Sequence, residues 1–244
     1  MERMLEATAR AEDVHYWFRA LRRHAQHMLR SALRQQRLDR IVDCGSGTGR
    51  NLDWLGNFGD AVGVELTPVG LAAGRARGRR MVRGSVTDLP FGDASADLAT
   101  SFDVLYCLED DAERKALREM WRILRPGGLM LVNVAALDIL HGSHSTLTHE
   151  VRRYTRARLR ERLERAGFTV ERLTFTNMSL FPPALAVRAL QRLTGRAAEA
   201  SDADLAVPAA PINGLLDTVL TVEAAVLSKV NLPVGTSIMA VGRK

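Results

Sequence analysis

The 244-residue sequence is poor in cysteine, lysine and aromatic residues, and these shortages narrow the class of protein. Its two cysteines, Cys44 and Cys107, are too few for a disulfide scaffold or a cysteine metal site, so buried free thiols are expected. No uninterrupted apolar run approaches the roughly 18 residues of a membrane span, and the N-terminus lacks the apolar core of a signal peptide. These absences predict a soluble, cytoplasmic protein.

Lysine is so rare that arginine supplies most of the 34 basic residues, and the formal net charge is +6. This charge permits contact with nucleic acid or an anionic membrane. However, the arginines are spread along expected helical faces rather than gathered in one tract, which indicates solvated surface. With 46% hydrophobic residues, the length suits one α/β core with a small appendage rather than two independent domains.

The chain is organised around residues 41–51, which read Ile-Val-Asp-Cys-Gly-Ser-Gly-Thr-Gly-Arg-Asn. Apolar residues lead into a carboxylate, three glycines alternate with small residues, and a polar helix start follows. The glycines permit a tight turn and expose main-chain N–H groups at a helix N-terminus, so an anionic, nucleoside-like ligand is expected. A dinucleotide fingerprint would have its third glycine where this sequence has Arg50.

This glycine pattern resembles motif I of the class I S-adenosylmethionine-dependent methyltransferases. The resemblance covers roughly residues 40–178 and 232–244, and is closest to small-molecule methyltransferases, including quinone-biosynthesis enzymes. It implies S-adenosyl-L-methionine as cofactor and S-adenosyl-L-homocysteine as product. The motif residues that it places at the cofactor are Asp43, Gly45, Ser46, Gly47 and Gly49.

A second acidic position follows at the end of an expected buried strand over residues 61–66. Glu65 lies about 20 residues beyond Gly45, where a carboxylate can accept hydrogen bonds from both ribose hydroxyls of a nucleoside. Leu66, directly after it, is included in the expected cofactor site.

Two further segments complete the expected cofactor site. By the resemblance, Asp88 accepts a hydrogen bond from the exocyclic amine of adenine, while Val86 and Leu89 flank the ring. Phe102 lies near the carboxyl end of an expected strand over residues 97–104. It therefore lies where ligands bind in open α/β sheets.

Strands that alternate with helices predict a doubly wound, Rossmann-like α/β sheet of seven strands, mostly parallel. By the resemblance, the last strand is antiparallel. Asp110 and Glu113 have capping-box spacing before one of the helices. The expected division is a helical cap over residues 1–38, a methyltransferase domain over 39–179 and 231–244, and a helical insertion over 180–230.

The cap reads as one amphipathic helix, in which Trp17, Phe18 and Arg19 are candidate pocket residues. The insertion reads as two apolar-faced helices, over residues 184–193 and 215–230, joined by a linker rich in alanine and proline. A lid over the acceptor is the favoured interpretation of the insertion, with a dimer contact or membrane docking as alternatives.

Residues 138–154 carry three histidines and a tyrosine on a loop expected to leave the carboxyl edge of the sheet. Histidine titrates near neutral pH, so His144 and His149, with Tyr154, are the candidate bases or acceptor-orienting groups. His141 belongs to the same loop. No cysteine or paired carboxylate completes a ligand set, so no metal is expected.

The sequence therefore predicts methyl transfer to a small, apolar or aromatic acceptor by a monomer or homodimer, mainly through positioning. Nucleic acid is an unlikely partner, because neither the Asn/Asp-Pro-Pro-aromatic signature nor a Pro-Cys nucleophile is present. A nucleic-acid methyltransferase, a nicotinamide oxidoreductase, and a protein that uses the fold for binding or another reaction remain open alternatives. The acceptor atom, oxygen, nitrogen or carbon, also stays open.

Overall fold

The computed structural model describes residues 2–33, 37–141, 150–194 and 206–244. Its seven strands form one sheet in the order β3-β2-β1-β4-β5-β7-β6. The strands are β1 (Leu38–Cys44), β2 (Gly59–Glu65), β3 (Met81–Arg83), β4 (Ala96–Phe102), β5 (Leu124–Ala135), β6 (Thr169–Thr176) and β7 (Ser237–Arg243). Strand β7 is antiparallel to both neighbours, while β3, β2, β1, β4 and β5 pair in parallel. The predicted seven-stranded sheet with an antiparallel last strand is confirmed.

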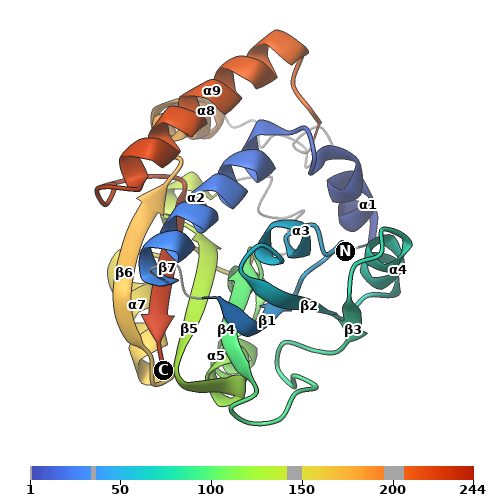
Figure 1. Ribbon diagram of the computed structural model, residues 1–244. Helices are drawn as coiled ribbons and strands as arrows, with labels where there is room; N and C mark the ends of the chain where they lie inside the picture. Colours follow the sequence, from blue (N-terminus) through green and yellow to red (C-terminus); the bar gives the residue numbers. More distant parts are fainter. Residues whose placement is uncertain (1, 34–36, 142–149, 195–205) are drawn as a thin grey trace.

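Helices cover both faces of this sheet (Figure 1). They are α1 (Glu2–Ala11), α2 (Tyr16–Leu33), α3 (Leu52–Leu55), α4 (Pro68–Ala76), α5 (Asp110–Ile123), α7 (Arg156–Arg165), α8 (Phe181–Thr194) and α9 (Ala210–Leu227). Helix α2 crosses one face, and α5 and α7 lie behind the other. The central strands β4 and β5 are almost wholly buried, as apolar parallel strands are when both faces are covered.

The strand order reverses between β1 and β4, because the chain builds β1, β2 and β3 toward one edge and then returns to the other side of β1. The crevice outside the carboxyl ends of the strands at such a reversal is where open α/β sheets bind ligands. The loops that follow β1, β2 and β4 all end at this crevice.

The single cap helix expected over residues 1–38 is wrong: the chain breaks it between α1 and α2. Neither glycine nor proline marks the break. Instead, the buried Glu12 accepts a 2.6 Å hydrogen bond from the Thr48 hydroxyl, and Arg22 donates to the Glu12 carbonyl at 2.8 Å. The contact between Glu12 and Thr48 of the glycine loop thus accounts for the break between α1 and α2.

The predicted capping box before α5 is also wrong. Glu109 is the N-cap residue and makes no side-chain cap bond, while Glu113 lies inside the core. The Glu113 carboxylate accepts from the Tyr154 hydroxyl at 2.7 Å and pairs with Arg152 at 3.0 Å. Because Glu113 precedes Leu117 and Met120 by one and two turns, it shares their inward face.

Both insertion helices begin earlier than the sequence suggests. Helix α8 starts at Phe181 and includes Pro182 and Pro183, and Pro211 lies in the first turn of α9. Proline is accepted there because the first N–H groups of a helix have no intrahelical partner. Helix α9 runs beside α2, where Arg23 pairs with Asp217 at 2.7 Å.

Candidate functional site

The glycine loop turns sharply after β1 because its glycines adopt positive φ angles. A Cβ on Gly45 would lie 2.6 Å from a Val104 methyl, and one on Gly49 would lie 2.7 Å from the Met81 sulfur. The Gly45 and Ser46 amides both donate to the Val64 carbonyl at 2.9 Å, which fixes the loop beside β2. Alanine at either glycine would therefore be strained by its backbone conformation and would force the neighbouring side chain to shift.

This loop opens onto a cavity of about 370 Å³, here called the glycine-loop cavity. Predicted cofactor residues that line it are Gly45, Ser46, Gly47, Glu65, Leu66, Val86 and Phe102. Asp43 and Gly49 are absent from its lining. Asp43 lies behind the loop, where it accepts from Thr100 at 2.6 Å and burial raises its pKa to about 7. Both residues help to shape the loop, and their direct contact with the cofactor stays a prediction.

Glu65 is held at the end of β2 with its carboxylate at the cavity wall. One oxygen accepts from the Gly47 amide at 2.9 Å, and the other from the Thr67 amide and hydroxyl at 2.8 and 2.7 Å. A carboxylate offers about four acceptor positions. One position therefore remains for a ligand unless a protein bond is exchanged.

The segment after β3 lines the cavity with different residues from those predicted. Ser85 and Thr87 lie in the lining, and their hydroxyls are 2.8 Å apart. Asp88 is exposed and outside the lining, and Leu89 is buried with its amide bonded to Glu119 at 2.7 Å. Hydroxyls, rather than the Asp88 carboxylate, thus provide the polar groups at this end of the cavity.

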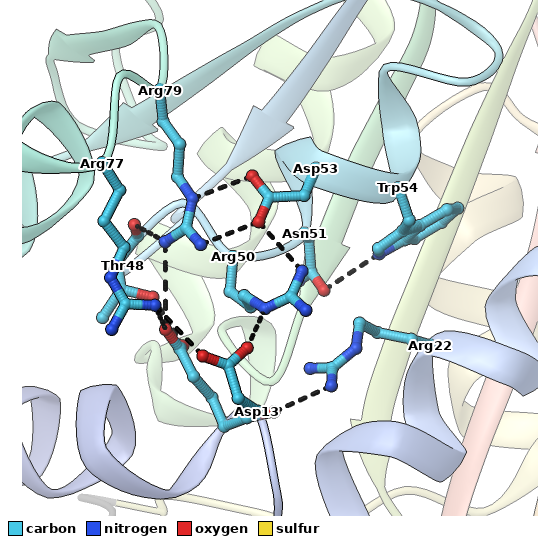
Figure 2. A network of polar contacts seen from close by, with 10 residues as sticks. Asp13, Arg22, Thr48, Arg50, Asn51, Asp53, Trp54, Arg77 and Arg79 are labelled. Carbon is cyan, nitrogen blue, oxygen red and sulfur yellow. Dashed lines mark hydrogen bonds and ion pairs between the residues drawn. The ribbon is translucent and has the colours of Figure 1, made fainter.

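The other end of the cavity is closed by the cap, through Leu5, Thr8, Glu12, Phe18 and Arg22. Figure 2 shows how this wall is bonded to the glycine loop: Arg50 bridges Asp13 of the cap and Asp53 of α3, and Arg79 also pairs with Asp53. Burial lowers the pKa of Arg22 to about 10, so its guanidinium stays charged at neutral pH.

A second cavity, of about 350 Å³ and here called the aromatic cavity, adjoins the first. Its ring-bearing lining residues are His15, Tyr16, Trp17, Phe18 and Tyr106. Of the cap candidates, Trp17 and Phe18 thus line it, whereas Arg19 pairs with Asp217 at 3.1 Å instead. From the insertion, α8 contributes Ala184 and Arg188.

The residues common to both cavities are Thr8, Phe18, Asp103 and Cys107. Burial raises the pKa of Cys107 to about 12, so its thiol is protonated at neutral pH. Both cysteines are free, as predicted. Asp103 is therefore the acidic group at the junction of the two cavities.

Asp103 follows the last residue of β4 and has a positive φ of 60°, which is uncommon for a residue with a Cβ. Its carboxylate accepts from the Asn133 amide at 2.8 Å. Burial raises the pKa of Asp103 to about 6, the negative Glu150 adds to the increase, and the Asn133 hydrogen bond opposes it. Asp103 was not predicted from the sequence. Its position directly after β4 is nevertheless similar to that of Glu65 at the end of β2.

His15 was also missed, although it begins a run of four ring-bearing residues. Its Nδ1 accepts from the Trp17 amide at 3.1 Å, and burial lowers its pKa. The ring is therefore neutral, with Nε2 left to carry the hydrogen. His15 can donate a hydrogen bond into the aromatic cavity.

Tyr154 lies away from both cavities, which corrects its assignment as a catalytic residue. Its side chain is fully buried, its hydroxyl donates to Glu113, and burial together with that carboxylate raises its pKa. His144 and His149 fall outside the described residues, and His141 is exposed. Within the described ranges, no His, Cys, Asp or Glu cluster is arranged to hold a metal.

Comparison with known proteins matches residues 42–132 to a family described as a methyltransferase domain. A probable S-adenosylmethionine-dependent methyltransferase of Mycolicibacterium smegmatis is 35% identical over 164 residues, 65% of this chain and 62% of that protein. A demethylmenaquinone methyltransferase of Mycobacterium tuberculosis is 38% identical over 119 residues, 48% of this chain and 46% of that protein. The chain thus spans less than two thirds of either relative.

A similar fold occurs in a solved structure of Burkholderia thailandensis 1,6-didemethyltoxoflavin-N1-methyltransferase with bound 1,6-didemethyltoxoflavin and S-adenosylhomocysteine. It has a TM-score of 0.57 and 19% identity, over 92% of this chain and 78% of that one. Residues 42–132 therefore match the methyltransferase domain family, and the strand order and the glycine loop with Glu65 agree with the class I fold and with S-adenosylmethionine as the cofactor.

Proposed function

We propose that this protein transfers the methyl group of S-adenosylmethionine to a small, apolar or aromatic acceptor bound in the aromatic cavity. The observation that carries the proposal is the junction of the two cavities at Asp103, which brings an acceptor site and a cofactor site together at one carboxylate. The names of two similar proteins, one for demethylmenaquinone and one for didemethyltoxoflavin, support an acceptor with a flat ring system.

The residues of the glycine-loop cavity fit the cofactor. Glu65 has an acceptor position for a ribose hydroxyl, and Leu66 and Val86 offer apolar surface for the adenine ring. At the cap end, Arg22 is a charged group that donates a hydrogen bond to the Glu12 carbonyl. It is suited to the carboxylate of an amino acid. Because Gly45 has no side chain, the cofactor can approach its main chain closely. A Cβ at this position would collide with Val104.

When bound, the cofactor supplies an electrophilic methyl carbon on its sulfonium. The main task of the protein is therefore to orient the nucleophile of the acceptor, and correct orientation can lower a barrier by about 7 to 11 kcal/mol. The rings of Trp17, Phe18 and Tyr106 would hold a flat acceptor, and His15 would donate a hydrogen bond to it. Helix α8 of the insertion would cover the acceptor on its open side through Ala184 and Arg188.

Asp103 would accept the proton of an acceptor hydroxyl or amine as that group attacks. Its raised pKa of about 6 leaves most of it ionised at neutral pH but still basic enough to take a proton. The neighbouring Glu150 is bonded to Arg153 on the same cavity wall, which fixes both side chains. Asp103 replaces Tyr154 as the proposed base.

The Arg22 role predicts a ligand-dependent effect. Arg22→Met should weaken S-adenosylhomocysteine binding by about 10- to 150-fold, since a hydrogen bond to a charged group contributes about 1.5–3 kcal/mol. The affinity for methylthioadenosine, which lacks the amino-acid carboxylate, should stay within about twofold of that of the unmodified protein. Calorimetry with both ligands measures this. Equal weakening of the two ligands would assign Arg22 to the nucleoside end or to the fold.

The proposed reaction is tested in two stages. Thermal shifts with S-adenosylhomocysteine, NAD and oligonucleotides should show stabilisation by the first ligand only, because only ligands of the native state raise its stability. The protein is then incubated with radiolabelled S-adenosylmethionine and a panel of flat phenols, naphthols and aromatic amines. Label in one of these acceptors supports the proposal. Label in oligonucleotide, or cofactor binding without transfer to any acceptor, would favour the rival functions.

A further inference from the structure

The outward face of α9 carries an apolar stripe, even though the opposite face of this helix packs against α2 (Figure 1). The stripe consists of Ile212, Leu215, Val219, Val222 and Val226. Each of these side chains is between 37% and 65% exposed. On the inner face, Leu220, Ala224 and Leu227 are buried. Helix α9 thus has two apolar faces, of which the intramolecular packing uses one.

The spacing within the stripe alternates three and four residues, which is the a/d repeat of helices that pack against each other lengthwise. The residues in the a positions, Ile212, Val219 and Val226, are all β-branched, and Leu215 and Val222 occupy d. Two-stranded coiled coils favour β-branched a positions. The pattern therefore indicates that one further helix packs on this face.

Charge on α9 also points to an identical partner. Asp217 lies on the side away from the stripe and pairs with Arg19 and Arg23. Glu223 flanks the stripe, but it is buried and its carboxylate accepts from the Ser179 amide and hydroxyl at 2.8 Å, so it is held within its own chain. The helix contains no lysine or arginine. When two copies meet across a two-fold axis, each residue near the axis faces itself, and an uncharged stripe meets no like charge.

A membrane surface suits this face less well. Helix α9 is long and apolar enough to cross a bilayer by length and composition, but its contacts with Arg23 and Ser179 hold it on the folded domain. Helices that lie on anionic lipid usually have basic residues beside the apolar face. The nearest basic residue in the chain is Lys229, beyond the last turn.

We propose that the stripe on α9 is the contact between two copies of this chain, related by a two-fold axis that passes near Val219. Val219 is the middle residue of the stripe, so it would meet its own mate whether the two helices run parallel or antiparallel. The inference is independent of the reaction.

The test is the mass of the full-length protein by sedimentation equilibrium. The unmodified chain should sediment as a dimer, and Leu215→Glu/Val222→Glu should sediment as a monomer, because four carboxylates would meet in the contact. The matched control, Leu190→Glu/Leu193→Glu, changes two exposed apolar residues of α8 and should stay dimeric. Circular dichroism and S-adenosylhomocysteine affinity should be unchanged in both variants, which excludes misfolding as the cause.

Cross-linking provides a second measurement. Val219→Cys should form a disulfide-linked dimer under mild oxidation, while Leu193→Cys should not, because Leu193 lies on α8, outside the proposed contact. The two native thiols are buried or half-buried, so they should not compete in this reaction. A monomeric unmodified chain, or a dimer that survives Leu215→Glu/Val222→Glu, would overturn the proposal. It would also be overturned if that variant kept its mass but lost binding to phosphatidylglycerol vesicles, which would assign the stripe to lipid.

Discussion

Replacement of Glu65 by alanine is expected to weaken S-adenosylhomocysteine binding by about 10- to 150-fold. The Glu65 carboxylate has one acceptor position left after its bonds to Gly47 and Thr67, and a hydrogen bond to a charged acceptor contributes about 1.5–3 kcal/mol. Methylthioadenosine should be weakened to the same extent, because the ribose belongs to both ligands. This result would distinguish the role of Glu65, at the ribose, from that of Arg22, at the amino-acid carboxylate.

The control for this prediction is Glu65→Gln, which keeps the size of the side chain and one acceptor oxygen but removes the charge. If the charge on the acceptor decides affinity, the glutamine variant should remain well below the unmodified protein. Calorimetry gives the affinities, and the unliganded melting temperature shows whether the glycine loop still folds. Unchanged affinity in a folded alanine variant would remove Glu65 from the cofactor site.

Asp103→Asn should lower kcat for methyl transfer by about 10²- to 10⁴-fold, the usual contribution of a positioned base. S-adenosylhomocysteine affinity should stay within about twofold, because the base addresses the acceptor rather than the cofactor. Stability should not fall above pH 6. A carboxyl whose pKa is raised by folding loses stability as pH rises from its ordinary value near 4 to about 6, and the neutral asparagine avoids this loss.

The pH dependence of kcat/KM distinguishes a base from a merely structural carboxylate. A base works when deprotonated, so activity of the unmodified protein should fall below about pH 6, and this limb should be absent in Asp103→Asn. Glu150→Gln is the matched control. Removal of its negative charge should lower the pKa of Asp103 and shift the limb to more acidic pH. An identical limb in all three proteins would show that Asp103 is not the titrating group.

The sheet could be predicted from the sequence because each of its strands carries a local signal. Apolar segments typical of buried strands alternate with segments of helical periodicity, and glycine or proline marks several of the turns. The parallel pairing of the strands then follows from the general rules for right-handed strand-helix-strand connections. The glycine loop and Glu65 were recoverable for the same reason: their chemistry depends on residues near a strand end. Both lie where the motif suggested.

The errors arose where distant contacts decide the local structure. Nothing local at Glu12 reveals that Thr48 will hold its carboxylate, and the capping-box spacing at Glu113 was outweighed by the Tyr154 and Arg152 contacts of a buried acid. One signal was available: an acid one turn before Leu117 on an apolar face indicates a buried partner. Asp103 could likewise have been found as a carboxylate that follows a buried parallel strand.

The packing of α2 on α9 has a consequence for synthesis of the chain. Arg23 and Asp217 are 194 residues apart, and α2, whose Met28 and Leu29 are buried, packs mainly against α9 and also against β7, both from the end of the sequence. At a typical translation rate of about 5–20 residues per second, this apolar face waits about 10–40 seconds for its partner to leave the ribosome. During that time the emerging chain has a surface that chaperones bind, and a ribosome that stalls before residue 210 leaves it uncovered.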